Sequence, residues 1–266
     1  MLLFYGYISS RVNSLSTTIA TRMDCIRATF EAGQKAAEEE VNDDILIKQL
    51  SKLDKKYRSV AYEGAAMARA VADLATGHST PHYFLGFLQH SLAHAIQVHI
   101  GLGWALSSKK IIDRRILDIF TYVMRDRILD GYGYCDGTFR RRHTIEKQQI
   151  PFFITETELQ AYDQGVGRSL WYSSRAELEQ LFKCTDLFAT DRKPNLWRGI
   201  GIAIAYVGGC DEKMLHTIAD YAGIYRPNLC TGAAQAQNSR AIAETHDLDT
   251  DYAYQTFHTF HTSYGT

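Results

Sequence analysis

The chain has 266 residues, 45% of them hydrophobic, and a formal net charge of −1 at pH 7. This composition supports one large domain or two small ones with a sizeable core. The near-neutral charge argues against a nucleic-acid partner. No apolar run is long enough to span a membrane, and the start lacks the basic segment of a signal peptide. The five cysteines are scattered without Cys-x-x-Cys pairs, which indicates reduced thiols, a cytoplasmic location and no zinc cluster.

Two helices are predicted at the N-terminus. Residues 13–40 place apolar side chains at three-to-four spacing, which is the period of an amphipathic helix. A second helix is expected over residues 42–57, with Asn42 or Asp43 as its cap. We interpret residues 1–60 as an N-terminal helical cap over the rest of the chain.

A short glycine motif recurs through residues 61–266. Most copies read Gly-x-Gly, two read Gly-Ala-Ala, and each opens an apolar helical run. The first glycines of the copies are Gly64, Gly101, Gly131, Gly165, Gly199 and Gly232. Their steps of 37, 30, 34, 34 and 33 residues match the length of one helical hairpin. With no period-two strand pattern, we predict an all-α fold of six degenerate hairpins that form a curled solenoid or an α/α toroid-like domain.

The repeated glycines need a physical reason, because glycine inside a helix costs about 1 kcal/mol relative to alanine. A missing side chain lets a neighbouring helix or a ligand come close. One interpretation is tight helix packing along an inner wall. The other is that some glycines form the floor of a small-molecule pocket, and the two are compatible.

Equivalent positions of a repeat array fall on the same wall, so the residues just before each glycine are candidates for chemistry. The candidate catalytic residues chosen in this way are Glu63, His99, Asp130 and Asp163. The candidate substrate-binding residues are Trp104, Tyr132, Tyr134, Arg168, Trp171, Trp197 and Arg198. Acids and bases among aromatic rings are the usual composition of a ligand site. The alternative is structural: the acids complement helix dipoles, or pair with buried arginines.

Six phrases together carry a family resemblance. In chain order they are YEGAAMA at 62–68, VHIGLGWA at 98–105, LDGYGY at 129–134, DQGVGRSLW at 163–171, LWRGIG at 196–201 and AYVGG at 205–209. Over residues 62–245 the chain closely resembles the domain-of-unknown-function family 1702, whose members recur in enediyne polyketide gene clusters. The resemblance implies a bacterial natural-product setting and a role on a polyene or similar hydrophobic intermediate. It supplies no reaction and no catalytic residues.

We therefore expect a natural-product biosynthesis protein that binds a hydrophobic polyene or isoprenoid-like intermediate in an aromatic-lined cavity. Acid–base assisted cyclisation or isomerisation, or a lyase-type reaction, would suit such a site. The alternative is a tetratricopeptide-like adaptor that binds a synthase or carrier protein. His90 and His94 are four residues apart, but no third ligand accompanies them, so no metal and no cofactor are predicted. The sequence leaves a homo-oligomer open.

Overall fold

The computed structural model describes residues 2–77, 80–110 and 114–263, with side chains from residue 18 to residue 259. Within these ranges all regular secondary structure is helical, as predicted, and no strand occurs. The helices are α1 (Leu2–Glu39), α2 (Asp43–Leu50), α3 (Arg58–Thr76), α4 (His82–His90), η1 (Leu92–His94), α5 (Ala95–Lys109), α6 (Arg114–Asp118), α7 (Tyr122–Phe139), η2 (Arg142–Glu146), α8 (Glu156–Ser174), α9 (Leu178–Asp186), α10 (Lys193–Val207), α11 (Glu212–Ala222), η3 (Gly223–Tyr225), α12 (Arg226–Ile242) and α13 (Leu248–Ser263).

Local side-chain chemistry sets several helix boundaries. Thr155 and Glu158 form a reciprocal capping box at the start of α8. Asn42 caps α2, since its side chain accepts a hydrogen bond from the backbone N–H of Ile45 at 3.2 Å. The helix predicted over residues 42–57 ends at Leu50, which corrects that prediction. The chain turns there because Asp54 accepts a hydrogen bond from the backbone N–H two residues on, at 2.8 Å.

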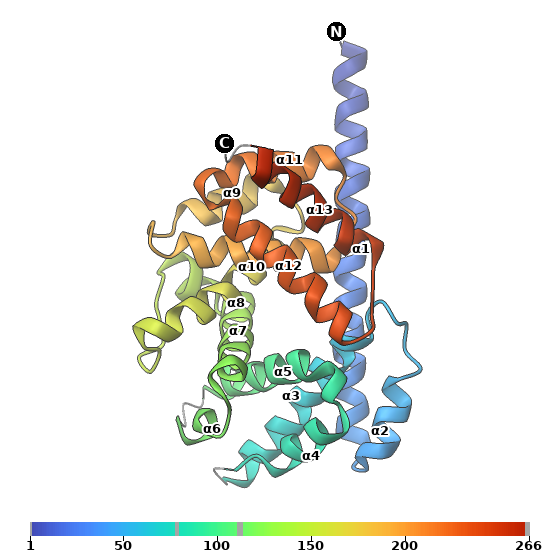
Figure 1. Ribbon diagram of the computed structural model, residues 1–266, viewed down its shortest axis with the longest axis vertical. Coiled ribbons are helices and arrows are strands. Elements are labelled where there is room, and N and C mark those ends of the chain that lie inside the picture. The colour runs from blue at the N-terminus through green and yellow to red at the C-terminus, as the bar shows by residue number, and fades with distance from the viewer. Residues whose placement is uncertain (1, 78–79, 111–113, 264–266) are drawn as a thin grey trace.

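Seven helices pack one against the next in chain order, namely α1, α3, α5, α7, α8, α10 and α12. We call them the glycine row. In Figure 1 they follow one another around the body of the molecule, from α1 to the orange α12. The remaining helices, apart from α13 at the end, connect consecutive members of this row.

The prediction that the glycines open their helices is wrong, because they lie in the middle of long helices. Gly101 and Gly103 lie inside α5, and Gly131 and Gly133 lie inside α7. A Cβ atom added at any of the four would lie closer than 3.0 Å to a backbone carbonyl oxygen of the adjacent helix. Each glycine is therefore required by a crossing at which two backbones touch.

The same contact occurs at each crossing. From α5 on, the first glycine of a motif faces the carbonyl oxygen of the residue that precedes the previous motif's glycine. The pairs are Gly101 with Glu63, Gly131 with Ile100, Gly165 with Asp130, Gly199 with Gln164 and Gly232 with Arg198. Gly64 makes the same kind of contact with the carbonyl oxygen of Phe30 in α1, three residues before Gly33. Because the crossings are alike, equivalent positions on successive helices point in equivalent directions.

Helix α1 takes part in the glycine row. A Cβ atom on its Gly33 would clash with the carbonyl oxygen of Ala61 in α3. Residue 60, where we placed the end of an N-terminal cap, lies in the first turn of α3. The division into a cap of residues 1–60 and a repeat domain of residues 61–266 stays a prediction.

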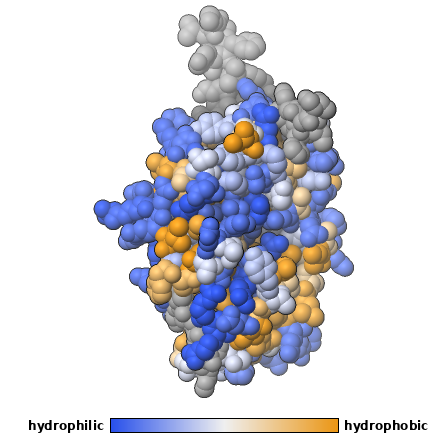
Figure 2. Space-filling model, turned by 60° about the vertical axis from the view of Figure 1, so that its left-hand side comes forward, coloured by the Kyte–Doolittle hydropathy of each residue, from blue (hydrophilic) through white to orange (hydrophobic). Residues whose placement is uncertain are grey.

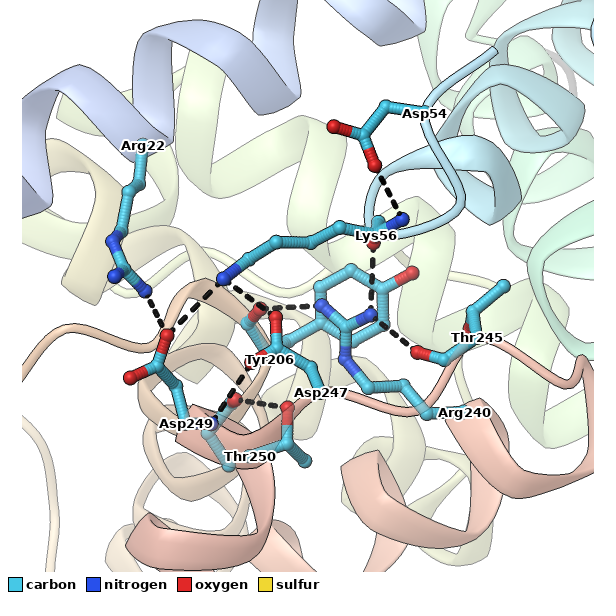
Figure 3. A network of polar contacts seen from close by, with 10 residues as sticks. Arg22, Asp54, Lys56, Tyr206, Arg240, Thr245, Asp247, Asp249 and Thr250 are labelled. Atoms are coloured by element: carbon cyan, nitrogen blue, oxygen red, sulfur yellow. Dashed lines mark hydrogen bonds and ion pairs between the residues drawn. The ribbon is translucent and has the colours of Figure 1, made fainter. Parts of the chain in front are cut away.

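A polar network joins the two ends of the glycine row (Figure 3). Arg240 of α12 donates hydrogen bonds to the carbonyl oxygens of Lys56, Tyr206 and Thr245 at 2.8, 2.9 and 3.0 Å. The Lys56 ammonium group pairs with Asp247 at 2.6 Å and with Asp249 of α13 at 3.1 Å. Asp249 also forms an ion pair with Arg22 of α1. We call these residues together the closure network.

Candidate functional site

The seven helices of the glycine row surround a cavity of about 530 Å³. This volume is in the range of small-molecule pockets, about 300–1,000 Å³. The six helices that carry the motif contribute the same position to the lining. The residue that follows the motif's second small residue lies in the wall each time, as Met67, Trp104, Tyr134, Arg168, Ile202 and Gln235. On α1, which carries no copy of the motif, Gln34 follows the single Gly33 and also lies in the wall.

Glu63 of α3 is a buried carboxyl group in this wall, with 4% of its surface exposed. Its Oε1 accepts a hydrogen bond from the indole Nε1 of Trp104 at 2.9 Å. Burial raises the pKa of Glu63 to about 7, with Asp130 raising it further and Arg168 opposing the shift. At neutral pH this carboxyl group therefore holds its proton for a large fraction of the time.

Asp130 of α7 lies in the same wall and has strong partners. Its Oδ1 accepts from Nη1 of Arg168 at 3.0 Å, and its Oδ2 accepts from the amide of Gln164 at 2.7 Å. Both partners come from α8. The guanidinium group of Arg168 also lies over the Tyr134 ring, 4.5 Å from its centroid. Asp130 is thus the anion of a buried ion pair, which corresponds to the salt-bridge alternative for these two residues.

Aromatic rings cover much of the cavity around these charges. Trp104 packs against Phe30 at 5.2 Å and against Tyr134 at 4.8 Å between ring centroids. Tyr172 packs against Tyr134 at 5.5 Å between ring centroids. Burial raises the pKa of both phenols well above the usual value, so both stay neutral.

The two carboxyl groups in the wall differ in what they can do. Asp130 has an arginine and an amide as partners, whereas Glu63 has one indole N–H. Two carboxyl groups in different environments can have different roles, as in sites where one donates a proton and the other stays ionised. Glu63 is suited to give a proton and take it back. Arg168 can stabilise the carboxylate left behind.

Two predicted catalytic residues lie away from the cavity lining. Asp163 is buried and ion-paired with Arg192, whose Nε donates to it at 2.9 Å. The Nδ1 of His99 lies 2.6 Å from the carbonyl oxygen of Ala95. Its ring packs edge-on against Phe120, 5.2 Å between centroids, and burial lowers its pKa. Neither belongs to the set of residues lining the cavity.

The predicted binding residues divide in the same way. Trp104, Tyr134 and Arg168 line the cavity. Tyr132, Trp171 and Trp197 are buried in the core of the protein and line neither hollow described here. Arg198 lines a smaller pocket beside the cavity.

Sequence reasoning missed several lining residues. Tyr172, Tyr206 and Ser239 each lie seven positions after the first glycine of their motif, and all three line the cavity. Seven residues make about two helical turns, so this position repeats the direction of the motif. A search at that spacing would have found them.

A metal site is not formed by the described residues, since no group of three or more His, Cys, Asp or Glu side chains comes together among them. The ring of His94 is buried beside the Ser59 hydroxyl at 3.0 Å, whereas His90 is part-exposed on α4. No helix within the described ranges is both long and apolar enough to cross a membrane.

Comparison with known proteins identifies the family. The model of the family described as "Protein of unknown function (DUF1702)" matches residues 10–264. No curated protein and no solved structure matches the chain. The matched region contains α1 from residue 10 onward, the other six helices of the glycine row and all the cavity-lining residues named above. The chain belongs to the DUF1702 family.

Proposed function

We propose that the chain binds a hydrophobic intermediate of bacterial natural-product biosynthesis in the cavity, a polyene or an isoprenoid-like compound, and acts on it by acid–base chemistry. On this proposal the glycine row is a curled, toroid-like array of degenerate helical hairpins. The setting in enediyne-type polyketide pathways comes from the family resemblance alone. The observation that carries the proposal is Glu63, a buried proton donor beside an ion pair in an aromatic cavity.

The reaction that suits these groups is an isomerisation or cyclisation started by protonation. Glu63 gives its proton to one carbon of a double bond, so a C–H bond forms and the neighbouring carbon becomes cationic. The rings of Trp104 and Tyr134 can stabilise that cation through their faces. Loss of a proton from an adjacent carbon to the Glu63 carboxylate restores the acid, and no other reactant is consumed.

Arg168 has a supporting role in this scheme. It lies in the cavity wall, paired with Asp130, and it favours the ionised form of Glu63. The carboxylate left after proton transfer is therefore stabilised as it forms. The aromatic rings around Glu63 limit the contact of water with a cationic intermediate, which water would otherwise capture.

The adaptor alternative has less support. An adaptor holds its partner on an exposed surface, whereas the aromatic and ionisable groups described above point into a cavity. On the face shown in Figure 2, hydrophobic side chains form small separate groups among hydrophilic ones. That face offers no single large apolar area for a protein partner.

The test is the Glu63→Gln variant, which keeps an acceptor for the Trp104 indole and removes the acid. We expect product formation to fall about 100-fold, a typical contribution of a general acid. The measurement is mass spectrometry of products after incubating the purified protein with pathway intermediates or extracts. Glu179→Gln, at an exposed site on α9, is the matched control and should leave the yield unchanged. Unchanged product formation by a folded Glu63→Gln variant would rule out the acid–base role.

A further inference from the structure

A second pocket of about 110 Å³ adjoins the large cavity. The two share Arg127 of α7 and Gln235 of α12 as lining residues. They are also joined through Gln164, which lines the small pocket and donates to Asp130 in the wall of the large one. A ligand in the cavity could therefore extend a group into the smaller pocket.

Two arginines without ion pairs face this pocket. Arg127 and Arg198 form no hydrogen bond and no ion pair with any residue in the described part of the chain. The Nε of Arg198 is buried with no hydrogen-bond partner. Burial lowers the pKa of Arg198, and the positive charge of Arg127 lowers it further. Two cations that repel each other in a partly buried place are an unfavourable arrangement without an anion.

The pocket's only acid among the described residues is Asp126, and it does not neutralise the pair. Asp126 influences Arg198 electrostatically but forms no ion pair with either arginine in the described structure. Burial raises its pKa. Two arginines and one carboxylate leave an excess of positive charge.

Two other buried arginines have hydrogen-bond and ion-pair partners within the protein. Arg69 donates to two carbonyl oxygens and pairs with Asp43. Arg192 pairs with Asp163 through two nitrogens. The arginines of the small pocket have neither kind of partner, which points to a partner from outside the chain.

We propose that the small pocket binds the anionic group of a ligand, a carboxylate or a phosphate, whose apolar body lies in the large cavity. This inference rests on the proposed function for the apolar half only. The pocket has the volume of only a few water molecules, at about 30 Å³ each in the liquid. It therefore suits a charged headgroup and excludes a bulky chain. Arginine forks match both carboxylate and phosphate oxygens.

The experiment uses a fluorescent conjugated tetraene fatty acid, its methyl ester and an alkyl phosphate of similar length. Binding of the acid is followed directly, and the ester and phosphate are measured by displacement. We expect the wild-type chain to bind the acid or the phosphate at least tenfold more tightly than the ester. Added salt should reduce this preference, because the charges are partly exposed.

The double variant Arg127→Gln/Arg198→Gln should lose about tenfold or more of its affinity for the acid or the phosphate and keep its affinity for the ester within twofold. Arg127→Lys/Arg198→Lys should retain part of the preference, which separates charge from folding. The matched control is Arg142→Gln, an exposed arginine that lines neither the large cavity nor the small pocket. It should leave all three affinities unchanged.

Equal affinities for acid, phosphate and ester in the wild-type chain would overturn the anion pocket, and so would equal loss of all three in the double variant. Failure of both anionic probes to bind would overturn it as well. If the ester binds as tightly as the acid and Glu63→Gln still loses activity, the anion pocket fails and the proposed function stands. If binding depends on the anionic group and Glu63→Gln has no effect, the anion pocket stands and the acid–base role of Glu63 fails. A preference for acid over phosphate, or the reverse, identifies the headgroup.

Discussion

The cavity wall and the closure network both bring carboxyl groups and cations together in the interior, yet their charges are balanced differently. In the closure network both Nη atoms of Arg240 have carbonyl partners, and Lys56 contacts two carboxylates. In the cavity wall Arg168 forms an ion pair with Asp130 and acts on Glu63 only through its charge. Glu63 accepts a single hydrogen bond, from the indole of Trp104. The carboxylates of the closure network are paired with cations and stabilise the fold, although Nε of Arg240 has no hydrogen-bond partner. The Glu63 carboxyl group forms no ion pair among the described residues and can exchange its proton.

We expect the largest change in stability from the Arg240→Met variant, which removes the centre of the closure network. Arg240 is 1% exposed, and its guanidinium group links α12 to the turn before α3 and to α10. Its loss leaves three carbonyl oxygens without their donor, so we expect a loss of about 3–5 kcal/mol in the free energy of unfolding. Urea denaturation measures it. A loss below 1 kcal/mol would show that the closure network does not hold the ends together.

The next effect is a dependence of stability on pH that comes from Glu63. The folded pKa, about 7, is above the ordinary value of 4.5, so the folded chain binds more protons than the unfolded one between these values. Stability is then present at low pH and is lost as pH rises through 7. We expect up to about 2.5 kcal/mol to be lost between pH 5 and pH 8.

The Glu63→Gln variant is the control for that measurement, because the amide does not titrate. The difference in unfolding free energy between wild type and variant should change over this pH range and be flat above pH 8.

The contribution of the closure network to stability should depend on pH in the opposite way. Its Asp249 has a lowered pKa although burial opposes it, because Arg22 and Lys56 favour the carboxylate. Its contribution is lost only as pH falls below the ordinary value of about 4. A Glu63→Gln variant with the same pH profile as the wild type would contradict this difference.

The smallest effect is expected from Arg22→Gln. The Arg22–Asp249 pair is partly exposed, at 25% and 35% of the two side chains, and Lys56 remains beside the carboxylate. Partly exposed pairs contribute little, so the loss should be about 1 kcal/mol or less. Thermal unfolding at low and high salt measures it. A loss as large as that of Arg240→Met would mean that the ion pair, rather than the arginine–carbonyl bonds, holds the network.

Part of the site could be found from the motif alone. Glu63 and Asp130 both directly precede a motif glycine, and both lie in the cavity wall. The residue just after the motif lines the cavity on all six helices that carry a copy, and Trp104, Tyr134 and Arg168 occupy that position. Other aromatic residues that sequence reasoning chose, such as Trp171 and Trp197, do not occupy this position and lie in the core instead.

The sequence by itself determined the helical class, the family and the recurrence of glycines, because each is encoded in local composition and spacing. Only the tertiary structure decided that these glycines lie where helices cross at their middles. It also decided that Asp163 pairs with Arg192 and that Asp130 pairs with Arg168. Charge pairing and burial depend on the rotation of each helix against neighbours about 30 or more residues away. The pKa of Glu63, and with it the proposed chemistry, depends on that packing.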